Sequence, residues 1–327
     1  MRVVIAGASG FMGQAIRASY AADGAEVRTI GRAGADVEWD DPAALHEVID
    51  GADLLVNLAG KSVNCRYGPA NRDEILRSRV ATKRALAEAV ARAAAPPPTW
   101  FNASTATIYR HAEDRPMTES TGELGQGFSV SVARAWEDAF FETELPATRR
   151  VALRTAIVLG DGSALIPLLR LARVGMGGAH FDGRWPASRA RRQAGTYHEF
   201  GARWGRQHFS WVHLDDVVGS LRFLADRADI AGVVNVTSPN PSDDATLMRT
   251  IRRVLGVPFG IPLPRWALEV GSAAIRTETE LVLKSRWVLP ERLLEAGYRF
   301  RYPDLEQAVR QIVQARSWRH RPVPAAG

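Results

Sequence analysis

Three glycines near the start of the chain have the spacing that phosphate binding requires. Gly7, Gly10 and Gly13 follow a short apolar run at residues 3–6 and open a segment with helical periodicity. In such a strand–turn–helix unit, the glycines allow a tight turn, a close approach of the backbone to a diphosphate, and close packing of helix on strand. The N–H groups and partial positive charge of the helix N-terminus then attract the phosphates. A glycine turn with a purely structural role is the alternative. The residues predicted to contact a dinucleotide here are Gly7, Ser9, Gly10, Phe11, Met12 and Gly13.

The end of the second predicted strand, at residues 26–30, indicates which dinucleotide would bind. Sites that prefer NAD usually place an acidic residue there, which holds the ribose hydroxyls. Here Gly31 is followed by Arg32 instead. A guanidinium pairs well with a 2′-phosphate, so the sequence favours NADP(H) over NAD(H) and predicts that Arg32 binds the cofactor. A solvated surface arginine is the alternative.

A second turn follows the strand predicted at residues 53–58. Ligands of open α/β sheets lie at the carboxyl ends of the parallel strands. The turn Asn57-Leu58-Ala59-Gly60 is at such an end. We therefore predict that Leu58, Ala59 and Gly60 also face the cofactor.

The elements that position these turns alternate regularly over the first 160 residues. Strands are predicted at 3–6, 26–30, 36–39, 53–58, 100–103 and 151–159. Helices are predicted between them at 11–22, 42–50, 73–95 and 132–144. This alternation implies right-handed βαβ units and a parallel sheet. We predict an α/β fold, a doubly wound parallel sheet of Rossmann type, with a smaller, mainly helical C-terminal lobe.

The predicted division of the chain follows from the looser pattern after residue 160. Residues 1–216 are assigned to the dinucleotide-binding domain and residues 217–317 to the lobe, which returns some elements to the main domain. The lobe is predicted to hold helices at 217–225, 244–255, 262–283, 290–295 and 305–315, with a strand at 233–236. Residues 318–327 are expected to form a flexible tail.

With these motifs placed, the chain resembles the extended branch of the short-chain dehydrogenase/reductase superfamily. Within that branch it is most similar to an atypical group labelled sugar-nucleotide epimerase-like, of the NAD-dependent epimerase/dehydratase superfamily, which carries its own C-terminal domain. The residues that carry the resemblance are Gly7 to Gly13, Asn57 to Ser62 with Cys65-Arg66, Ser78-Arg79-Val80, Ala103 to Tyr109, Ala135-Trp136-Glu137, Leu153 to Gly160, Gly205-Arg206-Gln207, Phe209 to His213, Asn235 to Pro241, Leu289-Pro290 and Leu293 to Gly297.

The resemblance implies a nicotinamide cofactor near Thr105 and near the loop after Arg154. Thr155, and Ser104 beside Thr105, are therefore predicted cofactor contacts. The resemblance also implies that the C-terminal lobe binds the substrate. It does not identify that substrate.

The acid/base pair of the superfamily is missing from this sequence. Ordinary members use Tyr-x-x-x-Lys with a serine or threonine, and the tyrosine moves a proton while hydride passes to or from the cofactor. No tyrosine here has a lysine four residues later, and the two positions fall at about Ser129 and Ala133. A serine is a far weaker acid than a phenol, and alanine carries no charge.

Three residues near the cofactor remain candidates for catalysis. Thr105 matches the family's serine or threonine, with Ser104 beside it, and a hydroxyl there can bind a substrate oxygen. A threonine that satisfies backbone groups at a strand end is the alternative. Tyr109 is the nearest phenol and a candidate replacement acid. A packing role, with the hydroxyl at the edge of the core, is the alternative for Tyr109.

A second group of residues is predicted to bind the substrate. The segment 206–216 lies beside the substrate in extended members, and Arg206 with Gln207 can hold a phosphate or carboxylate. The predicted substrate contacts are Lys61, Arg66, Arg206, Gln207, Ser210 and Trp211. His213 is interpreted as a structural hydrogen-bonding residue, with a base as the alternative. Cys65 is either a thiolate favoured by nearby cations or a small buried apolar residue.

Residues 178–205 look like an insertion rich in arginine and aromatic residues. One hypothesis is a lid or specificity loop that binds an anionic ligand. The alternative is a surface loop packed by its own aromatic side chains. The residues concerned are Arg184, Arg189, Arg191, Arg192 and Arg203 with Trp185, Tyr197, Phe200 and Trp204.

Composition excludes several other classes of partner. The net charge is +6, but lysine occurs only at Lys61, Lys83 and Lys284 and the arginines are spread along the chain, so we expect no nucleic-acid partner. No apolar run has the length of a membrane span, no signal peptide is recognised, and Cys65 is the single cysteine. We therefore expect a cytoplasmic protein without a membrane partner. No histidine spacing indicates a metal site, and a homodimer is left open.

Two functions are consistent with the sequence. The first is an NADP(H)-binding, epimerase-like oxidoreductase that acts on a small, anionic or nucleotide-linked substrate with a non-standard acid/base set. The second is a catalytically silent NADP(H)-binding sensor or protein-interaction factor, for example in cell division, which the missing tyrosine and lysine favour.

Overall fold

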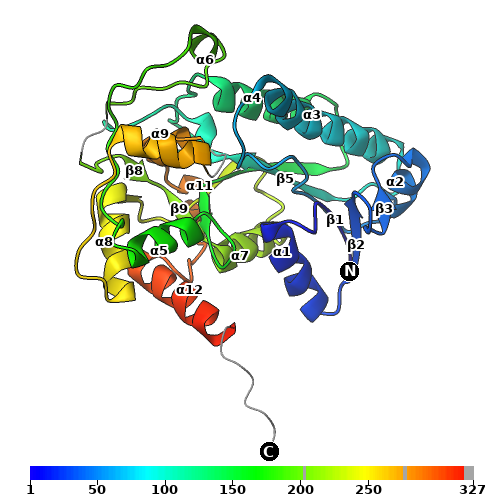
Figure 1. Ribbon diagram of the computed structural model, residues 1–327. Coiled ribbons are helices and arrows are strands. Elements are labelled where there is room, and N and C mark those ends of the chain that lie inside the picture. Colours follow the sequence, from blue (N-terminus) through cyan, green and yellow to red (C-terminus); the bar gives the residue numbers. More distant parts are fainter. Residues whose placement is uncertain (202–203, 275–277, 320–327) are drawn as a thin grey trace, which may run out of the picture.

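The apolar runs of the first half of the chain form one parallel sheet, which is the core of the molecule (Figure 1). The computed structural model describes residues 1–201, 204–274 and 278–319. The sheet has seven strands in the order β10-β6-β5-β4-β1-β2-β3, and every neighbouring pair is parallel. The strands are β1 (Arg2–Ala6), β2 (Glu26–Gly31), β3 (Val37–Glu38), β4 (Leu54–Asn57), β5 (Thr99–Thr105), β6 (Arg149–Thr155) and β10 (Gly232–Val236). The predicted fold class is confirmed.

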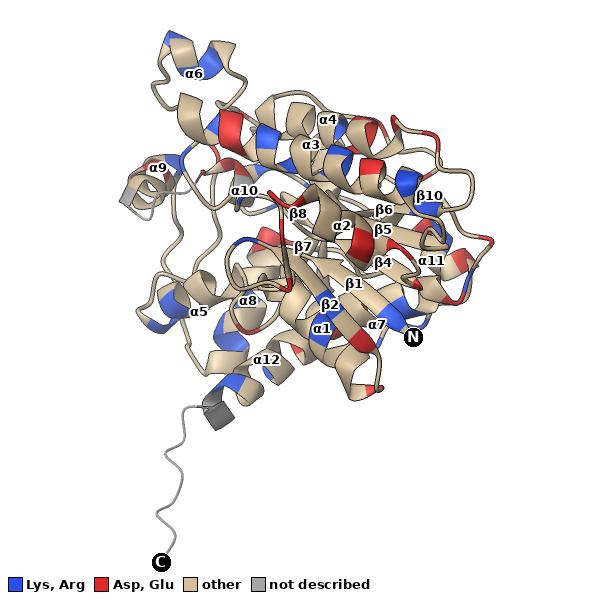
Figure 2. Cartoon of the chain, turned by 90° about the vertical axis from the view of Figure 1, so that its right-hand side faces the viewer, with Lys and Arg blue, Asp and Glu red and all other residues tan. Residues whose placement is uncertain are grey.

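Both faces of this sheet are covered by helices, so successive residues of a strand belong to different cores. Val3 and Ile5 pack in a cluster with residues of helices α1 (Phe11–Ala22) and α7 (Leu214–Ala225). Val4 and Ala6 pack with residues of the helices on the other face, which are α2 (Pro42–Ile49), α3 (Pro69–Arg92) and α4 (Phe128–Phe141). Figure 2 shows these two helical layers on either side of the strands. Burial on both faces explains why the strands are continuously apolar.

Two small sheets lie outside the main sheet. One pairs β7 (Ile157–Leu159) with β9 (Trp211–His213), and the other pairs β8 (His208–Phe209) with β11 (Ser242–Asp243) of the lobe. A third core lies among α5 (Leu165–Arg173), α8 (Asp244–Leu255) and α12 (Leu305–Arg319). The remaining helices are α6 (Arg189–Gln193), α9 (Arg265–Ala274), α10 (Glu280–Leu283) and α11 (Glu291–Glu295), with a 3-10 turn η1 (Ala106–Ile108) after β5. No helix in the described part of the chain is long and apolar enough to cross a bilayer.

Several predicted elements differ from the observed ones. The strand predicted at 151–159 is two strands, because the chain leaves the main sheet at Ala156 and β7 pairs with β9. The helix predicted at 262–283 is two helices, α9 and α10, and α3 begins at Pro69 instead of residue 73. Helix α5 and the strands β8, β9 and β11 were not predicted. In the region assigned to the lobe, α7 and β10 return to the main domain. Of the predicted tail, residues 320–327 lie outside the described residues.

Lys83 is a buried amine at the contact between α3 and α4. Its Nζ lies 4.7 Å from the centre of the Trp136 ring, and the Arg79 guanidinium lies 4.8 Å from the same ring. No acceptor for the Lys83 ammonium is present among the described residues. Burial, together with the Arg79 charge, holds the pKa of Lys83 well below its usual value. A buried amine without an acceptor destabilises the folded state.

We therefore expect Lys83→Met to increase the free energy of unfolding, by about 1 kcal/mol or more at neutral pH. Folding lowers the pKa of Lys83, so burying this side chain costs the most folding free energy at pH values well below its unfolded-state pKa of about 10.4. That cost disappears as the pH rises toward this pKa. The advantage of the variant over the wild type should therefore shrink with rising pH. Urea denaturation at about pH 7 and about pH 9 measures this. Arg77→Met, an exposed change on the same helix, is the control; a Lys83→Met protein less stable than the wild type at both pH values contradicts the prediction.

Candidate functional site

Two positions of the glycine turn after β1, Gly7 and Gly13, have no room for a side chain. Gly7 has a φ of +81°, and a Cβ there would lie 2.9 Å from the Ala59 backbone nitrogen. A Cβ at Gly13 would lie 2.4 Å from the Gly7 carbonyl oxygen. Gly10, the N-cap of α1, is exposed together with Ser9, while Phe11 and Met12 are half-buried. The turn therefore presents backbone N–H groups and the N-terminus of α1 at the carboxyl edge of the sheet, as diphosphate binding requires.

Two neighbouring strand ends meet this turn at the same edge. The Gly7 N–H donates to the Ile30 carbonyl at 2.9 Å, so Arg32, which is exposed immediately after β2, lies one strand away. After β4, the buried Asn57 side chain accepts from the Ala59 N–H at 3.0 Å and donates to Asn102 at 3.0 Å.

The turn after β4 is thereby fixed, with Leu58 half-buried, Ala59 buried and Gly60 exposed. A Cβ at Gly60 would lie 3.3 Å from the Arg79 guanidinium carbon. The structure thus brings together the predicted cofactor residues of three strand ends.

Thr105 and Thr155 are partners in the parallel register of β5 and β6. Both are half-buried at the carboxyl ends of their strands. The Thr105 hydroxyl accepts from the Thr107 N–H at 3.1 Å, and the Thr155 hydroxyl donates to the Leu153 carbonyl at 3.2 Å. Thr105 therefore satisfies a backbone group at its strand end, which was the alternative interpretation of this residue. Its hydroxyl proton remains available for a ligand.

A buried hydrogen-bond network lies directly beneath this edge. The Glu137 carboxylate of α4 accepts two bonds from Arg154, at 2.9 and 2.7 Å, and one from the Ser104 hydroxyl at 2.5 Å. Arg154 also donates to the Tyr109 hydroxyl at 3.0 Å, which in turn donates to the Asn235 side chain at 2.9 Å. Ser104 and Tyr109 are both buried. This geometry supports a structural role for them instead of the predicted catalytic one, because their hydroxyls are already engaged inside the core.

The two positions of the missing acid/base pair have different surroundings. Ala133 is fully buried among apolar side chains that include Ile108 and Val288. Ser129 is half-buried, and its hydroxyl donates to the Glu280 carboxylate at 2.7 Å. The His198 Nε2 lies 3.6 Å from the same Glu280 oxygen. A carboxylate from the lobe is therefore hydrogen-bonded to the residue at about the position of the superfamily's tyrosine.

Segment 278–288 of the lobe docks against the loops at the carboxyl edge, which the sequence did not predict. The Glu278 carboxylate accepts from the Tyr67 N–H at 2.8 Å. The Lys284 ammonium donates to the Thr107 carbonyl at 2.7 Å, and the Arg286 Nε donates to the Thr107 hydroxyl at 3.2 Å. Burial, with the Arg286 charge nearby, lowers the pKa of Lys284 to about 8. The signal in the sequence was the closely spaced acids and bases from Glu278 to Arg286, within an otherwise apolar helical region.

The predicted substrate residues do not form one group. Lys61 is paired with Glu74 at 2.6 Å, and Arg66 lies 3.5 Å from Glu278. Arg206 is exposed.

The other three predicted substrate residues are enclosed. Ser210 bonds the backbone of Arg286 and Val288, Trp211 is fully buried, and the Gln207 amide donates to the His180 carbonyl. Burial therefore removes Gln207, Ser210 and Trp211 from the surface that a substrate would contact.

His213 and Cys65 have the less reactive of their two roles. His213 caps α7 by accepting from the Asp215 N–H at 3.1 Å, its other ring nitrogen lies 3.0 Å from Gln311, and burial lowers its pKa. Burial also raises the pKa of the Cys65 thiol and outweighs the Lys61 charge, so a thiolate is disfavoured.

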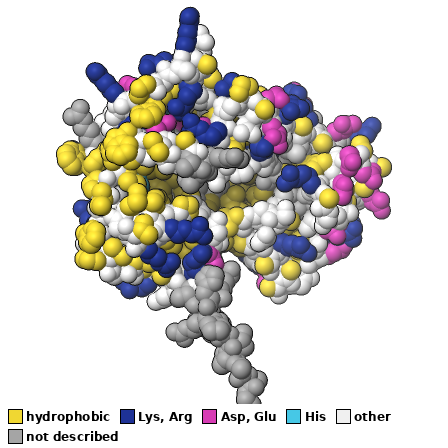
Figure 3. Space-filling model, viewed as in Figure 1, with side chains coloured by type: hydrophobic (Ala, Val, Ile, Leu, Met, Phe, Trp, Pro, Cys, Tyr) yellow, Lys and Arg dark blue, Asp and Glu magenta, His cyan; other side chains and the backbone are white. Residues whose placement is uncertain are grey.

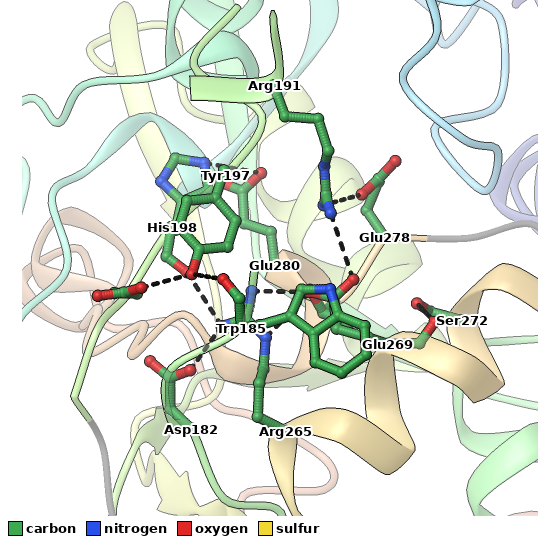
Figure 4. Close-up of polar contacts among 12 residues, drawn as sticks. Asp182, Trp185, Arg191, Tyr197, His198, Arg265, Glu269, Ser272, Glu278 and Glu280 are labelled. Carbon is green, nitrogen blue, oxygen red and sulfur yellow. Dashed lines mark hydrogen bonds and ion pairs between the residues drawn. The ribbon is translucent and has the colours of Figure 1, made fainter. Parts of the chain in front are cut away.

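The insertion is held to the lobe by buried ion pairs (Figure 4). Asp182 pairs with Arg265 at 2.5 Å, and Arg265 also pairs with Glu269 at 2.8 Å. Arg191 lies 3.4 Å from both Glu269 and Glu278. Arg191 is therefore engaged by protein carboxylates instead of a free anion. Arg203, also predicted here, lies outside the described residues.

The insertion and the lobe thus stand on one side of the carboxyl edge and the glycine turn on the other. Figure 3 shows the surface hollowed between these two parts of the molecule, with apolar side chains in the floor of the hollow. A dinucleotide and a small substrate both require such a depression at the carboxyl ends of the strands.

Comparison with known proteins agrees with this architecture. The NAD dependent epimerase/dehydratase family model matches residues 3–129, and a domain of unknown function (DUF1731) matches residues 263–312. Epimerase family protein SDR39U1 of Bos taurus is 30% identical over 96% of this chain and 100% of its own length. Epimerase family protein YfhF of Bacillus subtilis is 29% identical over 97% of this chain and 99% of its own length. The crystal structure of human epimerase family protein SDR39U1 (isoform2) with NADPH has a TM-score of 0.81 at 28% identity, covering 96% of this chain and 99% of that one.

The sheet, the glycine turn and these matches define an NAD(P)-binding Rossmann protein of the epimerase and short-chain dehydrogenase class. Within that class, the chain belongs to the epimerase family that includes SDR39U1, with the additional C-terminal domain. The family resemblance found in the sequence is confirmed.

Removing Arg154 and Glu137 together should cost less stability than the sum of the two separate removals. We expect Arg154→Met to lower the free energy of unfolding by about 3–5 kcal/mol, because Glu137 is left buried and charged. The double variant Arg154→Met/Glu137→Leu should be less destabilised than the sum of its two single variants. Urea denaturation of the four proteins measures this coupling, and strictly additive effects would show that the two side chains do not depend on one another.

Proposed function

We propose that this protein is an NADP(H)-binding, epimerase-like oxidoreductase that acts on a small, anionic or nucleotide-linked substrate without a Tyr-x-x-x-Lys pair. The observation that carries the proposal is the arrangement at one sheet edge of the tight glycine turn, Arg32 and Thr105. The residues fit the cofactor, because Gly7 and Gly13 allow the tight turn and the exposed Gly10, at the start of α1, lets the backbone approach a diphosphate. The human relative whose structure is described as containing NADPH supports the choice of dinucleotide.

Each part of the edge has a distinct role in this proposal. The N–H groups at the start of α1 would bind the diphosphate, and the Arg32 guanidinium would pair with the 2′-phosphate. The nicotinamide supplies hydride transfer when the cofactor is bound. The Thr105 hydroxyl, still able to donate, would hold the substrate oxygen.

We further propose that the lobe replaces the missing acid and cation. Lys284 donates to the Thr107 carbonyl and provides a positive charge near the edge. Ala133, at about the position of the superfamily's lysine, provides none. Ser129 with Glu280 provides a hydrogen-bonded path for a proton at the tyrosine position. Because the pKa of Lys284 is lowered to about 8, its ammonium can act as an acid near neutral pH.

Arg32→Glu should weaken binding of NADPH on the order of tenfold or more and leave NADH binding nearly unchanged, because only NADPH carries the 2′-phosphate. Calorimetric titration of purified protein, freed of any dinucleotide carried through purification, measures both affinities. Arg28→Glu, an exposed change on β2, the strand that ends just before Arg32, is the matched control. Gly10→Asp should instead weaken both dinucleotides, since it puts a negative charge beside the diphosphate. Equal loss of NADPH and NADH binding in Arg32→Glu contradicts the cofactor assignment.

A catalytically silent NADP(H)-binding sensor is the second candidate, and the apolar surroundings of Ala133 favour it. A screen of NADPH oxidation against small carbonyl compounds and nucleotide-linked sugars separates the two functions. For an enzyme, we expect the rate of carbonyl reduction to fall above about pH 8, where Lys284 loses its proton, and Lys284→Met to abolish that fall. Tight NADPH binding with no turnover of any candidate would favour the sensor.

A further inference from the structure

A group of large apolar side chains is exposed on the lobe and on the chain segments beside it. These side chains, called the apolar patch below, are 39–71% exposed. The apolar patch consists of Val174, Met176, Trp204, Phe259, Ile261, Trp266 and Val270. A folded protein rarely exposes so many large apolar residues together unless they contact another surface.

Segments distant in the sequence bring these residues to one surface. The Ile261 N–H donates to the Gly175 carbonyl at 2.8 Å, and a Cβ at Gly175 would lie 3.2 Å from the Phe259 ring. Trp266 and Val270 are four residues apart on α9 and therefore share one face of the helix. Figure 3 shows hydrophobic side chains gathered on the left, over α9 and the chain beside it.

The margin of the apolar patch is basic and has almost no acid. Segments 162–176 and 245–274 contain a single acidic residue, Glu269, which is buried and paired with Arg265. The same segments expose Arg170 and Arg173 on α5 and Arg249 on α8, whereas Arg253 of α8 is paired with Glu306 of α12 at 2.7 Å. Figure 2 shows basic residues on α5 and on α6. The charge around the apolar patch therefore fits a negatively charged partner.

A second copy of the chain is a poor occupant for this surface. In a twofold contact, the same patch from both molecules would meet, and the arginines at its margin would face one another. A flat surface of anionic headgroups has the complementary charge. Tryptophan and phenylalanine tips flanked by arginine are also the composition that proteins use at the boundary between headgroups and acyl chains.

We propose that the apolar patch docks the protein on a membrane surface rich in anionic phospholipid. Phe259, Ile261 and Trp266 enter the boundary between headgroups and acyl chains, and Arg170 and Arg173 contact the phosphates. This differs from the sequence-based expectation of no membrane partner. That expectation rested on the lack of a long apolar run, whereas the apolar patch is assembled from separate short segments.

The test is co-sedimentation of the full chain with vesicles of phosphatidylcholine alone or mixed with phosphatidylglycerol. We expect binding only to the mixed vesicles, reduced by added salt. Phe259→Ser/Trp266→Ser should bind on the order of tenfold or more weakly. Leu294→Ser, an exposed leucine on α11 outside the apolar patch, is the matched control and should bind normally. Arg170→Glu/Arg173→Glu should also weaken binding on the order of tenfold, whereas Arg92→Glu on α3 should not.

Three results would overturn the proposal. One is an absence of binding to the mixed vesicles at low salt. Another is equal binding by Phe259→Ser/Trp266→Ser and Leu294→Ser. The third is a dimer, seen by light scattering, that Trp266→Ser dissociates, since this would assign the apolar patch to a second copy of the chain. Retained NADPH binding by each variant confirms that it is folded, and the vesicle result is independent of any turnover.

Discussion

The buried carboxylate of Glu137 is the interaction on which the carboxyl edge depends. It binds Arg154 of β6 and Ser104 of β5 at once, and Arg154 continues through Tyr109 to Asn235 of β10. A buried charge of this kind is tolerated only when all its partners are in place. The network therefore holds α4 and three adjacent strands in one arrangement, directly below the residues that would meet a cofactor.

The same network also limits which groups are free for chemistry. Ser104 and Tyr109, which lie nearest to the edge, are committed to the core, and Ala133 is surrounded by apolar side chains. The polar groups that the lobe adds at the edge are Glu280 and Lys284, which are themselves buried. Segment 278–288 of the lobe is therefore part of the edge itself.

The parts of the fold that could be predicted are those set by local rules. The glycine spacing from Gly7 to Gly13 and the continuously apolar strands each depend on a few neighbouring residues, and both led to the observed sheet. Ser210 and Trp211 were assigned to a substrate surface because their motif lies beside the substrate in related proteins, but burial depends on what packs over them. Segment 278–288 covers Ser210, and nothing local indicates where that segment docks.

Charged residues were the hardest to interpret from the sequence. One of the two hypotheses for the insertion placed Arg191 on a free anion, yet Arg191 pairs with Glu269 and Glu278, which are distant in the sequence. An arginine has the same local pattern whether its partner is a ligand or a protein carboxylate, so only the fold distinguishes them. The apolar patch was missed for a related reason, since its residues come from three short segments that show no periodicity in common.

The position of β10 in the sheet has a consequence for how the chain is made. β10 pairs with β6, but the whole of α5, the insertion, β8, β9 and α7 lies between them in the sequence. During synthesis, the backbone N–H and C=O groups along one side of β6 therefore have no strand partner until Val236 has left the ribosome. An unpaired edge of this kind is a site for pairing with another chain. Slow translation between β6 and β10 would prolong that exposed state, whereas a slow step after β10 would not.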